Sequence, residues 1–113
     1  IHTAYESNSP RSELFDLFKG ILLLLDVKAI VRIKCNLYPR TSTIEQHPMH
    51  FDQNYTLKGA VFYVNSNNGF TVIGENKIES VANRIMLFDS SILHSSTSCT
   101  DQNARFTINF NYF

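Results

Sequence analysis

The feature that most limits the fold of this chain is a series of short, strand-like segments that starts at Ala29. The segments are rich in β-branched and aromatic residues and are separated by turn-forming residues. Residues 65–69 predict a hairpin turn in which Asn-Gly supplies positive φ angles, and residues 74–76 and 82–83 predict two further turns. The expected strands are 29–38, 47–52, 58–65, 70–73, 77–81, 84–89, 93–97 and 104–113.

One helix is expected before these strands. Ser9 is a suitable N-cap and Pro10 a suitable first helical residue, and apolar residues then recur at three- and four-residue spacing, which predicts a helix over about 10–26. Its run LFKGILLLLD is not expected to be a signal segment, because Asp16 and Lys19 interrupt the apolar stretch and no small-residue cleavage site follows. We expect a buried helix on one outer face of a compact, mostly β barrel or sandwich.

Composition restricts the partners and the location of the protein. The 113 residues predict a single domain, 1–113, with its barrel core at about 29–113, and the 43% hydrophobic content with no apolar run near twenty residues predicts a soluble globule. Ten basic residues balance ten acidic ones, so neither nucleic acid nor a membrane is indicated as a partner. Cys35 and Cys99 are expected to be free thiols rather than a pair, which favours the cytoplasm, bacterial or of a virus's host cell.

Two of the expected strands have one apolar and one polar face, because side chains alternate along a strand. In residues 30–38 and 105–113 every second side chain is apolar and those between are polar. In one interpretation the apolar faces fill the barrel and the polar faces meet water, as is common in antiparallel sheets. In the other, the apolar faces pack under the helix and the polar faces line an interior cavity. The Arg, Thr and Asn content of 105–113 keeps the second interpretation open, because these side chains suit directed hydrogen bonding.

A metal site is predicted around the stretch QHPMHFDQNY. On a strand, His50 and Asp52 point to one face, whereas His47, three residues earlier, points off that face. Alone this pair fits an ordinary polar surface strand as well as half of a metal site. His94, late in the chain on another strand-like segment, would complete a two-histidine, one-carboxylate triad with open metal positions. His2 is expected to lie in an unstructured end.

An open metal site that binds a dicarboxylic acid requires a cation for the far carboxylate. Arg105 lies eleven residues after His94, and Thr107 follows on the same strand face. Arginine suits this role because its planar fork matches a carboxylate.

In these residues the sequence resembles the Fe(II)- and 2-oxoglutarate-dependent oxygenases, in their prolyl-hydroxylase-like branch. The resemblance covers about residues 29–113. It rests on His50-Phe51-Asp52, His94, the strand from Arg105 to Phe113, Leu37-Tyr38-Pro39, and Ala60-Val61-Phe62-Tyr63-Val64-Asn65.

The resemblance implies a double-stranded β-helix, that is, a jelly-roll or cupin-like barrel. It further implies that His50, Asp52 and His94 are the metal-binding and catalytic residues, and that Arg105, Thr107, Tyr38 and Tyr63 hold 2-oxoglutarate. The implied cofactors are Fe(II), 2-oxoglutarate and dioxygen, with ascorbate as reductant. The implied reaction is hydroxylation of an unactivated C–H bond of a protein, peptide or small molecule, with a peptidyl proline as one candidate.

Alternatives remain at this point. One is a cupin-like metal enzyme that does not use 2-oxoglutarate, and another is a non-catalytic metal-binding barrel. Family members usually carry more N-terminal structure than residues 1–28 provide, so a minimal member, a fragment, and support from a second subunit, as in a homodimer, are also open. Asn36 and Asn109 are candidates for outer hydrogen-bond donors to the site.

Overall fold

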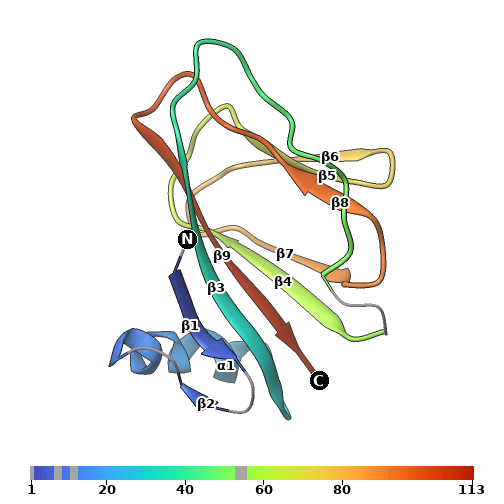
Figure 1. Ribbon diagram of the computed structural model, residues 1–113. Coiled ribbons are helices and arrows are strands. Elements are labelled where there is room, and N and C mark those ends of the chain that lie inside the picture. Colours follow the sequence, from blue (N-terminus) through green and yellow to red (C-terminus); the bar gives the residue numbers. More distant parts are fainter. Residues whose placement is uncertain (1, 7–8, 11–12, 53–55) are drawn as a thin grey trace.

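The structure is a computed structural model that describes residues 2–6, 9–10, 13–52 and 56–113, and it consists of two β-sheets with one helical segment (Figure 1). The elements are β1 (His2–Glu6), β2 (Ser9–Pro10), the 3-10 helix η1 (Glu13–Phe18), α1 (Lys19–Leu24), β3 (Ile30–Pro39), β4 (Lys58–Tyr63), β5 (Phe70–Ile73), β6 (Asn76–Glu79), β7 (Ile85–Asp89), β8 (His94–Ser96) and β9 (Ala104–Tyr112).

The larger sheet has the strand order β2-β1-β3-β9-β4-β7, and the smaller one has the order β6-β5-β8. All the paired strands of both sheets run antiparallel. The long strands β3 and β9 lie side by side near the middle of the larger sheet, with nine residue pairs in register (Figure 1). The architecture is therefore the predicted jelly roll, with helical structure on one outer face.

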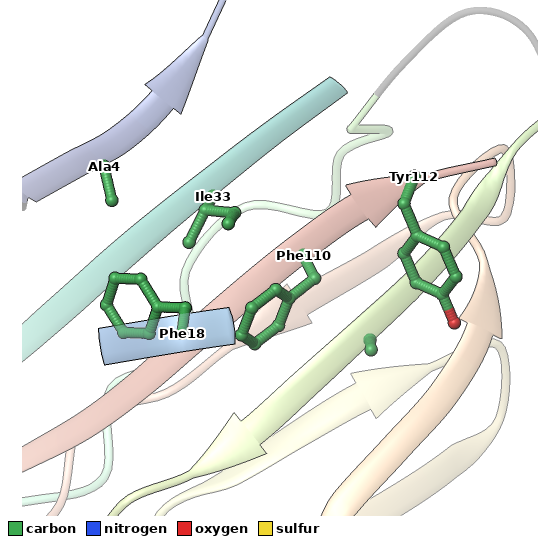
Figure 2. Packing of buried hydrophobic residues seen from close by; sticks show 6 residues of the cluster. Ala4, Phe18, Ile33, Phe110 and Tyr112 are labelled. Carbon is green, nitrogen blue, oxygen red and sulfur yellow. The ribbon is translucent and has the colours of Figure 1, made fainter. Parts of the chain in front are cut away.

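The larger core lies between the helical segment and the outer face of the larger sheet (Figure 2). Phe18 packs edge-on against Phe110 of β9, with ring centroids 6.1 Å apart. Ile33 of β3 is fully buried in the same cluster. The buried members are Ala4, Phe18, Ile33, Ala60, Phe110 and Tyr112.

This packing decides between the two interpretations of the alternating strands. The apolar faces of β3 and β9 pack under the helical segment, and their polar faces line a cavity between the sheets. The less common arrangement is thus the observed one. A second, smaller cluster of Val61, Tyr63 and Met86 lies on the inner side of the larger sheet.

The predicted helix over 10–26 was wrong in extent and in burial. Ser9 and Pro10 form a short strand that pairs with Glu6 and Tyr5, so the local pairing of the chain overrides their suitability as a helix start. No α1 residue is fully buried, and Leu23 is 83% exposed. The helix is too short to cover the sheet, and apolar side chains of the outer face such as Leu87 stay exposed.

The strand predictions need three corrections. Strand β1 was not expected, and its first residue, His2, pairs with β3 rather than lying in an unstructured end. Residues 47–52 form no strand, only an isolated bridge at His50, since Pro48 has no N–H with which to continue a ladder.

The third correction concerns 65–69. This segment crosses from β4 in one sheet to β5 in the other, so it is not a hairpin, and Gly69 has no positive φ. The other two predicted turns are observed, with positive φ angles at Gly74 and Asn83.

Candidate functional site

The two histidines of the predicted metal site are brought together by the backbone. His50 donates its N–H to the His94 carbonyl at 2.8 Å, and His94 donates back to the His50 carbonyl at 3.0 Å. This two-way bridge joins an irregular segment to β8 and holds the two rings with centroids 4.6 Å apart. It replaces the strand on which the prediction placed His50 and Asp52.

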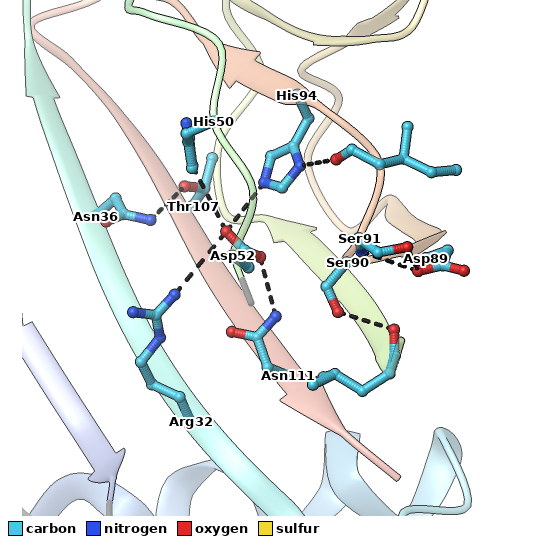
Figure 3. A network of polar contacts seen from close by, with 12 residues as sticks. Arg32, Asn36, His50, Asp52, Asp89, Ser90, Ser91, His94, Thr107 and Asn111 are labelled. Carbon is cyan, nitrogen blue, oxygen red and sulfur yellow. Dashed lines mark hydrogen bonds and ion pairs between the residues drawn. The ribbon is translucent and has the colours of Figure 1, made fainter. Parts of the chain in front are cut away.

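Asp52 completes the group (Figure 3). Its Oδ1 lies 3.0 Å from His94 Nε2 and 3.5 Å from His50 Nε2. Two ligand atoms at about 2.1 Å from one metal and at right angles to each other lie roughly 3 Å apart, so these separations suit neighbouring corners of one coordination sphere. The structure therefore brings the three predicted ligands together.

The hydrogen bonds around the histidines favour a metal as well. His94 Nδ1 lies 2.8 Å from the Ile92 carbonyl and His50 Nδ1 lies 3.3 Å from the Pro48 carbonyl. A carbonyl oxygen only accepts, so each Nδ1 is the donor in its contact, and in the neutral form of either ring Nε2 carries a lone pair. In His94 this lone pair faces a carboxylate oxygen. A cation between the two, either a proton or a metal ion, is needed to make that contact favourable.

The electrostatics of the metal-free site follow from the same contacts. Burial acts to raise the pKa of Asp52, but hydrogen bonds from His94 and Asn111 and the charges nearby outweigh it, so the pKa of this carboxyl lies below its usual value. Burial acts to lower the pKa of His94, but its bonds to Asp52 and to the Ile92 carbonyl raise it overall. The two shifts agree, and they describe a proton held between the ligands when no metal is bound.

The site opens into a cavity of about 230 Å³ between the sheets. The inner faces of β3 and β9 contribute Arg32, Lys34, Asn36, Tyr38, Thr107 and Asn109, and residues 94–96 of β8 lie opposite. Asn36 donates to Thr107 Oγ1 at 3.4 Å. His47 stacks on Tyr38 and is not part of the metal-ligand group, as predicted.

Arg105 is fully buried beside this cavity but is not among the residues that line it. Its guanidinium donates to Ser80, Ser96, the Thr97 carbonyl and Thr71, and of these Ser96 and Thr71 line the cavity. Among the described residues, none of its contacts is an ion pair with a carboxylate. The buried guanidinium therefore has hydrogen-bond partners but no counter-charge.

The two predicted tyrosines flank Arg105 but differ in their availability. The guanidinium carbon lies 5.4 Å from the Tyr38 ring centroid and 5.8 Å from that of Tyr63. The Tyr63 hydroxyl donates to Thr71 Oγ1 at 2.8 Å, and burial raises its pKa. Only Tyr38 lines the cavity, so it is the better placed of the two to meet a ligand there.

Three contributors to the site were missed by the sequence interpretation. Asn111 donates to Asp52 Oδ2 at 2.9 Å, although Asn36 and Asn109 were the candidates for such a role. The alternation of β9 placed Asn111 on the same face and could have identified it. Arg32 lies 3.9 Å from Asp52 Oδ1. Gly69 leaves room for Arg105, because an added Cβ would lie 2.5 Å from Arg105 Cδ, and no sequence signal indicated this.

The fold is shared with known structures. No protein-family model matches the sequence, and no curated protein sequence matches it. A Pseudomonas putida prolyl-4-hydroxylase superposes with a TM-score of 0.55 at 19% identity, over 88% of this chain and 62% of the hydroxylase chain. A cupin protein from Bacteroides fragilis superposes with a TM-score of 0.52 at 13% identity, over 81% of this chain and 72% of that one.

These likenesses establish the fold. The chain is a cupin-type jelly roll. It spans less than two thirds of the hydroxylase that it resembles. Separately, no helix in the described part of the chain is long and apolar enough to cross a membrane.

Proposed function

We propose that this protein is an Fe(II)- and 2-oxoglutarate-dependent oxygenase that hydroxylates a C–H bond. His50, Asp52 and His94 would hold the metal, since two imidazoles and one carboxylate are a ligand set typical of non-haem Fe(II) with open positions. The bound iron and cosubstrate would supply the oxidising power. The protein holds these ligands in place through the His50–His94 bridge and through the hydrogen bond from Asn111 to Asp52.

The observation that carries the proposal is that Arg105 is buried without a counter-charge among the described residues. A buried cation is costly unless an anion balances it, and the described residues offer it none. A carboxylate of 2-oxoglutarate in the cavity beside Thr71 and Ser96 would supply that charge. Thr107 and Tyr38 line the same cavity and would contact the bound acid. The prolyl-4-hydroxylase likeness supports the same assignment at the level of the fold.

The direct test is turnover and binding by the purified protein. Fe(II), ascorbate and 2-oxoglutarate are added in air, and succinate is measured, because enzymes of this kind consume some cosubstrate without their substrate. In parallel, the Fe(II) protein is titrated with 2-oxoglutarate without oxygen, and the weak visible charge-transfer band of the chelate is followed. We expect both signals in the wild type and neither in Asp52→Ala.

A second candidate is a cupin-type metal enzyme that does not use 2-oxoglutarate. It is favoured by one observation: Arg105 already has four hydrogen-bond partners and does not itself line the cavity. Iron binding without the charge-transfer band at any 2-oxoglutarate concentration would support this candidate over the oxygenase.

A further inference from the structure

The cavity beside the metal ligands contains more positive charge than the proposed cofactors require. Arg32 and Lys34 both line it, and among the described residues that line it Asp52 is the only carboxylate. In the described part of the chain, Lys34 has no ion pair, and the one acidic contact of Arg32 is Asp52 at 3.9 Å. Side chains on one strand face point the same way, so the two cations face the same space.

The remaining charges of the site balance without these two residues. A dianionic 2-oxoglutarate and Asp52 together offset a divalent metal ion and Arg105. Once Asp52 binds a metal, its charge is shared with the ion and no longer serves Arg32. Arg32 and Lys34 are then two unbalanced cations in a partly desolvated cavity, a setting that attracts an anion.

Among the described residues, the hydrogen bonding of Arg32 is incomplete. Its side chain is only 22% exposed, and no described residue is a hydrogen-bond partner of its buried Nε. Asn111 is directly opposite in the β3–β9 register, and its Oδ1 is likewise buried without a partner in the described part of the chain. Because Asn111 Nδ2 donates to Asp52, the orientation of this amide is fixed (Figure 3). Within the described ranges, a donor and an acceptor next to the metal ligands are therefore both without a partner.

We propose that Arg32 and Lys34 form a subsite for an acidic group, a carboxylate or a phosphate, on the molecule that is hydroxylated. This rests on the proposed function, because it takes the metal and 2-oxoglutarate to fill the rest of the cavity. The Nη2 of Arg32 lies 3.9 Å from a metal-ligand atom. When a metal–oxygen distance and the length of a hydrogen bond are added to this separation, the acidic group lies within about 9 Å of the metal. It is therefore close to the C–H bond that reacts.

The test compares acidic probes with their neutral counterparts. The protein is loaded with Mn(II) and 2-oxoglutarate without oxygen, and the N-acetyl amides of aspartate, glutamate and phosphoserine are titrated against those of asparagine, glutamine and serine. N-acetylproline amide is a further neutral probe. Binding is measured by calorimetry, and the paramagnetic relaxation of the probe protons by Mn(II) reports their closeness to the metal. The phosphoserine pair separates phosphate recognition from carboxylate recognition.

We expect at least one acidic probe to bind about tenfold or more tightly than its neutral partner, with relaxation by Mn(II). Arg32→Gln and Lys34→Gln should each remove most of this preference. The exposed Lys77 on β6 provides the control, and Lys77→Gln should retain the preference. If Arg32 served only to orient Asp52, Arg32→Gln would weaken Mn(II) binding and Lys34→Gln would change nothing, which would overturn the subsite.

Other outcomes are equally decisive. Equal binding of acid and amide, tighter binding of the proline probe, or no binding of any acidic probe at millimolar concentration would each refute the subsite. The 2-oxoglutarate titration in the same samples separates this failure from that of the proposed function. If 2-oxoglutarate binds and the acidic probes do not, the oxygenase proposal stands and the subsite fails. If 2-oxoglutarate does not bind but the acidic probes do, the oxygenase proposal fails, and with it the assignment of the acidic group to a hydroxylated molecule.

Discussion

Replacing Arg105 by lysine tests the proposed role of its guanidinium while keeping the positive charge. In the structure the Nε of Arg105 donates to Ser80 Oγ at 2.8 Å, and its Nη2 donates to Thr71 Oγ1 at 3.2 Å. A single ammonium cannot replace these two donors of the planar guanidinium and also donate to a carboxylate. The variant should therefore bind 2-oxoglutarate more weakly, although it keeps the positive charge.

The magnitude follows from one lost charge-assisted hydrogen bond, which is worth about 1.5–3 kcal/mol. At 1.4 kcal/mol per factor of ten, Arg105→Lys should weaken 2-oxoglutarate about ten- to a hundredfold. The assay is the anaerobic titration of the Fe(II) protein, with the dissociation constant taken from the charge-transfer band. Iron affinity should stay unchanged, because Arg105 lies outside the group of metal ligands.

Arg84→Lys is the matched control, since Arg84 is exposed and, within the part of the chain that the structure describes, its guanidinium donates only to the Glu79 carbonyl. It should bind 2-oxoglutarate like the wild type. His94→Ala should show no band at all, because a metal ligand is gone. The reasoning is refuted if Arg105→Lys binds 2-oxoglutarate as tightly as the wild type and stays folded.

Three further predictions concern the stability of the fold and site. Gly69→Ala should lower the free energy of unfolding, measured by urea titration, by about 1–3 kcal/mol, because its Cβ would lie 2.6 Å from the Ser98 carbonyl oxygen and 2.5 Å from Arg105 Cδ. A variant as stable as the wild type would contradict this close packing. Phe18→Ala should cost about 3–5 kcal/mol in the same assay, since this ring fills the core under the helical segment, and a loss below 1 kcal/mol would contradict that role. In metal-free protein, the pKa of His94 is raised and that of Asp52 is lowered, so the contact between them stabilises the folded state. This stabilisation should be lost as pH rises through the raised pKa of His94 and as pH falls through the lowered pKa of Asp52. Thermal unfolding followed by circular dichroism should show the highest stability of the wild type between these two pKa values. The same pH dependence in Asp52→Asn would contradict the role given to the His94–Asp52 contact.

The sequence was sufficient to predict most of the strands. Residues 70–73 were predicted with the bounds of β5, the bounds of β3 differ from the predicted strand by one residue at each end, and those of β9 differ by one residue at the C-terminal end. This success has a local cause, because alternation and turn residues are encoded within a few positions of each other. The same locality explains the failure at Ser9–Pro10, where pairing with β1 overrides a favourable helix start.

The sequence also predicted which residues form the candidate metal site, because a histidine and a carboxylate at this spacing were combined with a later histidine and arginine, and the structure places His50, Asp52 and His94 together. The way in which they converge was not predicted, since His50 and Asp52 do not lie on the predicted strand. The backbone bridge between His50 and His94 joins residues 44 positions apart, and only the completed fold can form it.

The sequence by itself determined which side chains alternate on β3 and β9, and hence that one face of each strand is polar and the other apolar. It did not determine which face points inward, because the same alternation suits a solvated sheet equally well. The tertiary structure decided this by placing Phe18 and its neighbours against the apolar face. That packing turns Arg32 toward the cavity and buries Arg105 behind Ser96 and Thr71, which line it, and the proposed anion sites rest on this placement.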